Sequence, residues 1–207
     1  MNKMCRTNAQ GGRSMIEMLG VLAIIGVLSV GGIAGYSKAM TKYRINKTID
    51  QITQISQNVR MLYGRQRQKN YRNLSGRILY KANLAPKEMF GSGYSMTNAW
   101  GEIFEVETTP DSANFTIATY IPSEEACIEL ATQDWGSLDT TGLNSVTISG
   151  GTGAGPDIDN ILGNCSGERG NGYAVACSGG ANISVPMPVD VAVDACSNNG
   201  GIYWFFQ

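Results

Sequence analysis

The hydrophobic pattern begins with a long apolar stretch near the N-terminus. Residues 18–34 contain no charged side chain, and Met15 and Ile16 extend the stretch to about 20 residues that only Glu17 interrupts. A helix rises 1.5 Å per residue, so about 20 residues span roughly 30 Å, the thickness of the hydrocarbon core of a bilayer. The pattern therefore predicts a segment that can cross a membrane.

Helical periodicity continues beyond this stretch. From Ile45 to Leu62, apolar residues recur at steps of three or four with polar residues between them, and no proline interrupts the region. We therefore predict one helix over about residues 14–64, roughly 75 Å long. Its first half, 13–35, is apolar on all sides, whereas its second half, 36–64, is amphipathic and must pack on another element.

The second half of the chain shows the alternation of strands. Residues 102–108 and 114–121 alternate apolar and polar side chains around a turn-forming TPDS, which predicts a β-hairpin. Ser123, followed by two glutamates, is typical of a helix N-cap and predicts a short helix. The inward positions of that helix would be Cys127, Leu130 and Ala131.

Further along, the pattern predicts short strands at 146–149 and 202–206. Breaker residues predict irregular structure over 64–100, and the glycine-rich residues 150–172 predict loops. The chain is therefore expected to be of the α+β class, with a small antiparallel sheet packed on the amphipathic half of the long helix.

Charge divides the chain into two unlike halves. The 16 basic and 17 acidic residues give a net charge of -1, but residues 1–72 carry 12 basic and 2 acidic residues, and residues 73–207 carry 4 and 15. The two halves are therefore expected to face different environments or partners. Histidine is absent, which excludes histidine zinc sites and histidine-dependent nucleophiles. We predict no enzymatic activity, no cofactor and no metal.

Four of the five cysteines lie in the acidic half, and Cys5 stands apart near the N-terminus. None of them forms a C-x-x-C pair, so zinc-binding and thioredoxin-like interpretations are weak. An even set of four in an exported domain predicts two disulfides, and three connectivities remain open. The four residues are Cys127, Cys165, Cys177 and Cys196.

A short basic leader, residues 1–12, ends at Gly12, and an isolated acid, Glu17, lies five residues later at the start of the apolar helix. A charge at the centre of a membrane costs about 2.5–3.5 kcal/mol, so this one needs a reason. The arrangement resembles the N-terminus of type IV pilins and of the pseudopilins of type II secretion. The resemblance implies that a prepilin peptidase cuts after Gly12 and methylates Arg13. It also implies that Glu17 neutralises the N-terminal amine of a neighbouring subunit during assembly.

The resemblance extends to the rest of the chain. Residues 114–135 and 192–206 are similar to the centre and the tail of type IVb pilins, each with a cysteine. This implies a pilin fold in which residues 65–207 form a disulfide-bonded α+β head. The implied disulfides are Cys127–Cys196 and Cys165–Cys177. The chain departs from the family at Arg13, where Phe or Met is usual.

In function, the resemblance implies a structural subunit of a type IV pilus-like filament. The implied partners are further copies of the chain, a prepilin peptidase, a pilus assembly platform and, before assembly, the inner membrane. The filament would then lie outside the cell and serve adhesion, and no nucleic acid is expected as a partner. The alternatives are a pseudopilin and, from another class, a membrane-anchored or secreted binding domain, including one cut as a secretory protein after Gly32 or Gly35.

Four further motifs have simpler interpretations. Asp157, Asp159 and Glu168 could hold calcium on a glycine-rich loop, but the ligand pattern is incomplete and a solvated acidic loop is favoured. The glycines of 150–155 are not followed by the lysine of a P-loop. The basic run 65–72 favours a solvated segment or a subunit contact over nucleic-acid binding. The G-x-x-x-G formed by Gly31 and Gly35 favours close small-residue packing over specific helix pairing.

Overall fold

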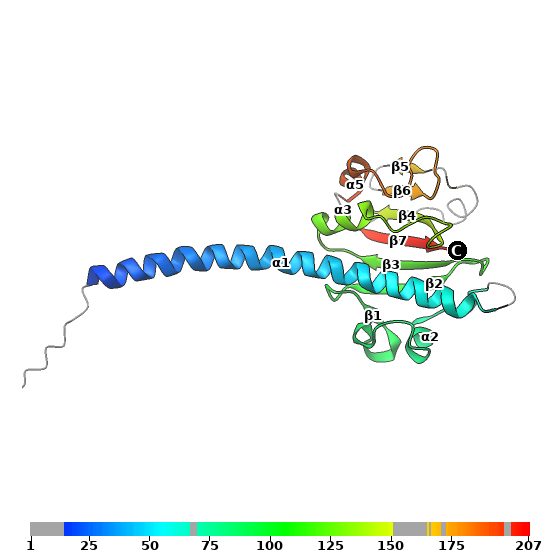
Figure 1. The fold of residues 1–207 in the computed structure, drawn as a ribbon, viewed down its shortest axis with the longest axis horizontal. Helices are drawn as coiled ribbons and strands as arrows, with labels where there is room; N and C mark the ends of the chain where they lie inside the picture. The colour runs from blue at the N-terminus through cyan, green and yellow to red at the C-terminus, as the bar shows by residue number, and fades with distance from the viewer. Residues whose placement is uncertain (1–14, 67–69, 151–164, 166, 171–172, 197–199) are drawn as a thin grey trace, which may run out of the picture. The chain divides into compact units, whose positions relative to one another are not determined.

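The computed structural model describes residues 15–66, 70–150, 165, 167–170, 173–196 and 200–207 (Figure 1). The chain divides into two compact units, one up to Thr41 and one from Lys42 to Gln207. The helix α1, Met15–Tyr63, contributes residues to both units and contains 49 residues. The prediction of one long N-terminal helix is therefore confirmed.

The described part of the first unit is an apolar helix with an exposed surface. Every residue from Met15 to Ala39 is exposed. Among the described residues, α1 is the one helix that is long and apolar enough to cross a membrane. A Cβ added at Gly31, Gly32 or Gly35 would meet nothing within 4 Å, so the backbone is open to its surroundings at these glycines.

The second unit contains a seven-stranded antiparallel sheet with the order β1-β2-β3-β7-β4-β6-β5. The strands are β1 (Met96–Thr97), β2 (Ile103–Thr108), β3 (Phe115–Tyr120), β4 (Leu143–Ser149), β5 (Glu168–Gly170), β6 (Tyr173–Cys177) and β7 (Gly201–Phe206). The remaining helices are α2 (Gly76–Lys81), α3 (Glu124–Thr132) and α5 (Val189–Cys196), with 3-10 turns η1 (Lys87–Met89) and η2 (Ser92–Tyr94). The expected α+β class is confirmed.

The strands form where side chains alternate between core and surface. In the hairpin of β2 and β3, Phe104 and Val106 are buried while the neighbouring Glu105 and Glu107 are exposed, as the sequence predicts. Phe115 and Ile117 of β3 face the same core. The last strand, β7, is inserted between β3 and β4, so the C-terminal segment holds the middle of the sheet together.

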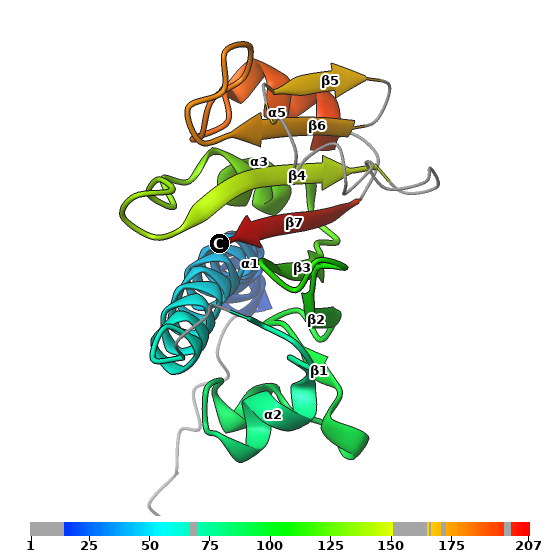
Figure 2. The ribbon, with the colours of Figure 1, turned by 90° about the vertical axis from the view of Figure 1, so that its right-hand side faces the viewer.

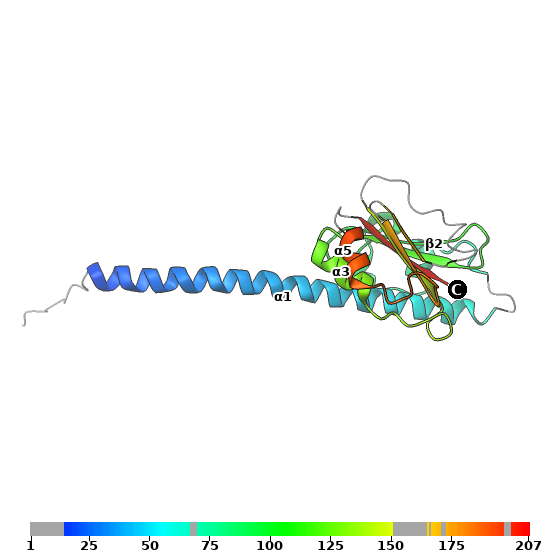
Figure 3. The ribbon, with the colours of Figure 1, turned by 90° about the horizontal axis from the view of Figure 1, so that it is seen from above.

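The core lies between one face of the sheet and the helices. Ile45, Ile52, Ile55 and Val59 of α1 are fully buried in one cluster with the inward residues of the sheet. Figures 2 and 3 show the part of α1 from Lys42 onward along this face, and Figure 2 shows α3 and α5 beside β4 and β6. The expectation that the amphipathic half of α1 packs on the sheet is therefore confirmed.

Three segments differ from their predicted structure. Residues 64–100 contain α2, β1 and two 3-10 turns where only irregular structure is expected. The glycine-rich region 150–172 is not loop throughout, because Glu168–Gly170 pairs with β6 as the edge strand β5. The strand predicted at 146–149 begins earlier, at Leu143, where a register shift between Leu143 and Ser145 hides the alternation.

Candidate functional site

The first candidate site is the exposed apolar part of α1. Glu17 lies in the first turn of the helix, where a negative charge is favoured by the helix dipole. Gly12 and Arg13, the proposed cleavage position, lie outside the described residues. Between Met15 and Ser37, Glu17 is the one charged residue of the sequence. An apolar surface of this extent indicates contact with lipid or with other apolar helices.

Ser29 and Glu17, two polar residues inside this apolar stretch, differ in whether the helix itself can supply a hydrogen-bond partner. The Ser29 hydroxyl donates a hydrogen bond to the carbonyl of Ile25 at 2.7 Å, so it needs no external partner. A carboxylate cannot donate such a bond, and within a membrane or a helix bundle it needs a cation or several donors. The chemistry of the helix therefore singles out Glu17 as the group that requires a partner.

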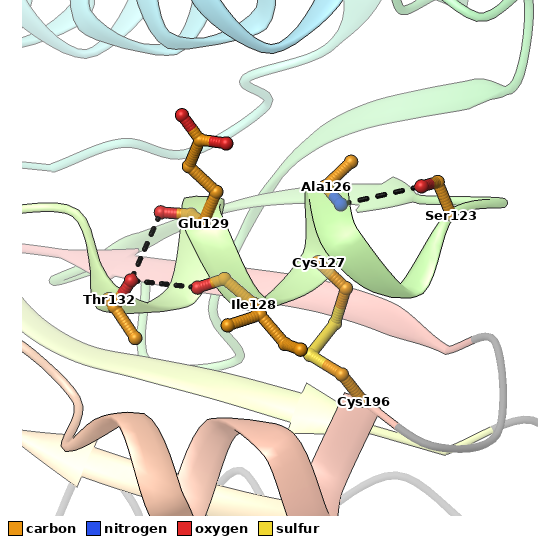
Figure 4. The surroundings of a disulfide bond; sticks show 7 residues. All are labelled: Ser123, Ala126, Cys127, Ile128, Glu129, Thr132 and Cys196. Atoms are coloured by element: carbon orange, nitrogen blue, oxygen red, sulfur yellow. Dashed lines mark hydrogen bonds between the residues drawn. A yellow bond between two sulfur atoms is a disulfide. The ribbon is translucent and has the colours of Figure 1, made fainter. Parts of the chain in front are cut away.

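The second candidate site is the cross-link between α3 and α5 (Figure 4). Cys127 and Cys196 form a disulfide with Cα atoms 5.9 Å apart, and both residues are buried. The Ser123 side chain accepts a hydrogen bond from the Ala126 N–H, as expected of an N-cap. The bridge therefore fixes a capped helix to α5, which directly precedes the last strand in sequence.

The second disulfide joins Cys165 to Cys177 of β6, with Cα atoms 5.7 Å apart. Cys177 belongs to a small buried cluster with Val175 and Phe205. Because Trp204 and Phe206 belong to the main core, the intervening Phe205 points to the opposite face of the sheet. The two bridges thus stabilise opposite faces of the sheet, and both pairs are those that the resemblance implies.

Ion pairs connect the amphipathic half of α1 to its neighbours in the second unit. Lys42 contacts the carboxylate of Glu129 and lies 3.5 Å from that of Glu125, both on α3. Lys47 contacts Glu88 of η1 at 3.0 Å. The hydrogen bond that Lys42 donates to the carboxylate of Glu129 raises the pKa of Lys42, and the one that Lys47 donates to Glu88 raises the pKa of Lys47. These contacts are partly exposed to solvent, so each contributes little to the free energy of unfolding.

The raised pKa of Lys42 gives a testable pH dependence. Because the folded-state pKa lies above the ordinary value of 10.5, the ion pair contributes fully below that pH and is lost as the pH rises through the folded pKa. We expect Lys42→Met to lower the urea midpoint of the full chain in detergent slightly at pH 8, because a partly exposed ion pair contributes little stability. The difference from the wild type should shrink above pH 10.5. Lys38→Met, outside the second unit, is the control, and a difference that stays constant with pH would contradict the assignment.

The other sequence motifs do not form a site among the described residues. Asp157 and Asp159 lie outside them, and Glu168 is exposed on the edge strand β5. In the part of the chain that the structure describes, no three His, Cys, Asp or Glu residues gather as metal ligands would. For the segment 65–72, the structure places Tyr71 in the core, 1% exposed, so it offers no exposed aromatic ring to a nucleic acid.

Two features of the site could not be found from the sequence. Tyr71 packs between Tyr63 and Phe115, with ring centroids 5.3 and 4.9 Å away, although its neighbours in sequence are basic and polar. The acidic partners of Lys42 lie more than 80 residues away on another helix. Neither contact leaves a local pattern, since both depend on how α1 is packed against the rest of the second unit.

A comparison with models of protein families identifies a family for most of the second unit. The family model described as PilS N terminal matches residues 42–199, which is more than half of the chain. The match begins at Lys42, where the second compact unit begins. No curated protein matches the chain.

Proposed function

Because the chain belongs to the PilS N-terminal family, which is related to type IV pilins, we propose that it is a structural subunit of a type IV pilus-like filament. The observation that carries this proposal is the exposed apolar helix from Met15 to Ala39, which precedes the matched region. The family is structural and non-enzymatic in general, which agrees with a function in assembly.

The proposed path begins in the inner membrane, where residues 13–35 hold the precursor. A prepilin peptidase removes the leader 1–12 after Gly12 and methylates the new N-terminus at Arg13. An assembly platform then transfers the subunit into a filament whose centre is a bundle of the apolar helices. The second unit, from Lys42 onward, would face the surroundings of the cell and determine adhesion.

The proposed path must explain why the apolar helices leave the lipid and associate with one another. Lipid tails are as apolar as leucine, so apolar helices gain little hydrophobic free energy by leaving lipid for one another. Close packing at small residues contributes, and the open backbone at Gly31, Gly32 and Gly35 allows it. A directional contact comes from pairing the Glu17 carboxylate with the amine of a neighbour, because either charge alone is costly in a dry bundle.

The first experiment is mass spectrometry of the mature protein from a host that has its own prepilin peptidase. We expect the chain to start at Arg13 and to carry one added methyl group. A chain that still starts at Met1, or one that starts near Ser37, would contradict the proposal and favour a membrane-anchored or secreted binding domain.

The second candidate, a pseudopilin of type II secretion, shares the same N-terminal processing. Electron microscopy of cells that express the chain separates the two, because a pilus subunit gives surface filaments at ordinary expression. The two disulfides at opposite faces of the sheet fit both candidates, since the periplasm and the outside of the cell are both oxidising. A processed chain that gives no surface filament would favour the pseudopilin.

A further inference from the structure

The second unit carries two surfaces of opposite charge, one on α2 and one on α3. The basic surface is formed by Arg77, Ile78 and Lys81 of α2 together with Asn73, Ser75 and Ala82. The acidic surface is formed by Glu124, Glu125, Ile128, Glu129 and Thr132 of α3. Each is a shallow, largely open surface with a half-buried isoleucine and a rim of charged side chains.

The basic surface concentrates a charge that is otherwise rare in this part of the chain. Residues 73–207 contain four basic residues, and three of them, Arg77, Lys81 and Lys87, lie on α2 and η1. All three are exposed. Arg77 and Lys81 are four residues apart, so they point to the same side of the helix.

The acidic surface keeps a net negative charge after its internal ion pairs are counted. Glu125 and Glu129 share the single cation Lys42, and none of the ion pairs among the described residues includes Glu124. Three carboxylates and one ammonium group leave a charge of about -2 on this surface at neutral pH.

The two surfaces lie at different places on the second unit. The basic surface lies near β1, at one edge of the sheet, because α2 contacts η2, which directly precedes β1. The acidic surface lies on α3, which packs on α5 and β4 beyond the centre of the sheet (Figure 2). Two different complementary surfaces on one subunit are what a head-to-tail contact requires, and such a contact gives an open helical assembly when its rotation does not close.

We propose that the basic surface of one copy docks on the acidic surface of the next copy. This inference rests on the proposed filament for its biological role. In the docked pair, Ile78 and Ile128 exclude water at the centre, and the charged rims set the orientation of approach. Rim charges act on specificity and association rate more than on affinity, so the contact weakens as salt is added.

Cysteine cross-linking in cell membranes tests the contact directly. Ala82→Cys and Thr132→Cys place one thiol at each surface without changing a charge, and Cys5→Ser in every variant removes the unpaired thiol. With a short bismaleimide reagent, the chain carrying both cysteines should give a ladder of dimers, trimers and larger species. Either cysteine alone should give no ladder. The pair Ala82→Cys and Glu107→Cys, with its second thiol on the outward face of β2, is the matched control.

Charge reversal gives a second measurement on the same ladder. Arg77→Glu should reduce the cross-linked species by about tenfold or more, and adding Glu124→Lys to the same chain should restore them. Arg169→Glu, an exposed reversal on β5, is the control and should have no effect. Failure of Glu124→Lys to restore the ladder would overturn the pairing of these two surfaces.

The outcomes separate this inference from the proposed function. Filaments that form without a ladder, or with equal ladders from the control pair, would overturn the docking contact and leave the filament proposal intact. A ladder in membranes from a chain that gives no surface filaments would support the contact between copies and argue against a pilus. If added vesicles that contain phosphatidylserine abolish the cross-linked species, the basic surface binds anionic lipid instead of another copy, and the docking contact is overturned.

Discussion

Replacing both Cys127 and Cys196 with alanine is expected to lower the free energy of unfolding of the second unit by about 4 kcal/mol, because this disulfide closes a long loop. The bridge joins residues 69 positions apart, and its removal restores that loop to the unfolded ensemble. Typical domains are stable by about 5–15 kcal/mol, so the loss is a large fraction of the total. Urea unfolding of the full chain in detergent, followed by tryptophan fluorescence, measures it.

The matched control is the pair Cys165→Ala and Cys177→Ala. This disulfide spans 12 residues, and the same loop-closure relation gives about 3 kcal/mol. Trp135 and Trp204 are in contact in the main core, with ring centroids 5.4 Å apart, so their fluorescence reports on the same core in both variants. A larger loss for the short-loop pair would contradict the loop-closure account and point to the small cluster around Phe205 as the main source of stability.

The elements that the sequence predicts are those with a local pattern. The steps of three and four in α1, the alternation in β2 and β3, and the cap at Ser123 each follow from neighbouring residues, and the structure contains all of them. The order of the strands in the sheet could not be predicted, because β7 pairs with β3 across more than 80 residues. No local pattern encodes that pairing.

The elements that were not predicted are held by distant contacts. In β6, Ala174 and Ala176 face the main core, but small alternating residues give a weak strand signal. The side chain of Asn98 donates hydrogen bonds to the Thr119 hydroxyl at 2.9 Å and to the Tyr120 carbonyl at 2.8 Å. In the sequence, nothing distinguishes Asn98 from an ordinary loop residue, because its hydrogen-bond partners lie about 20 residues away on β3.

The candidate sites divide in the same way, into one with a local sequence signal and others without one. Glu17 stands out because a charge inside an apolar run is costly, which is a property of the sequence alone. The charged surfaces on α2 and α3 do not stand out, because each contains only two or three charged residues in sequence. The structure shows that each of these short stretches forms one surface, with Ile78 in the basic surface and Ile128 in the acidic one.

Replacing Glu17 with valine is expected to leave cleavage after Gly12 intact and to reduce surface filaments by about tenfold or more. The reason is that the carboxylate would pair with the amine of a neighbouring subunit, and a charged contact of about 1.5–3 kcal/mol corresponds to about tenfold or more in an equilibrium. Filaments sheared from cells and quantified by immunoblot give the yield. Mass spectrometry of the membrane fraction gives the processed N-terminus.

Two further substitutions separate charge from shape at this position. Glu17→Gln keeps the size and hydrogen-bonding capacity of the side chain but removes its charge, so it should behave like valine if pairing with the amine is what matters. Glu17→Asp keeps the charge on a shorter side chain and should retain part of the assembly. Normal filaments from Glu17→Gln would refute the ion pair, and the carboxylate would then serve only to start α1, where a first-turn acid contributes about 0.3–1 kcal/mol.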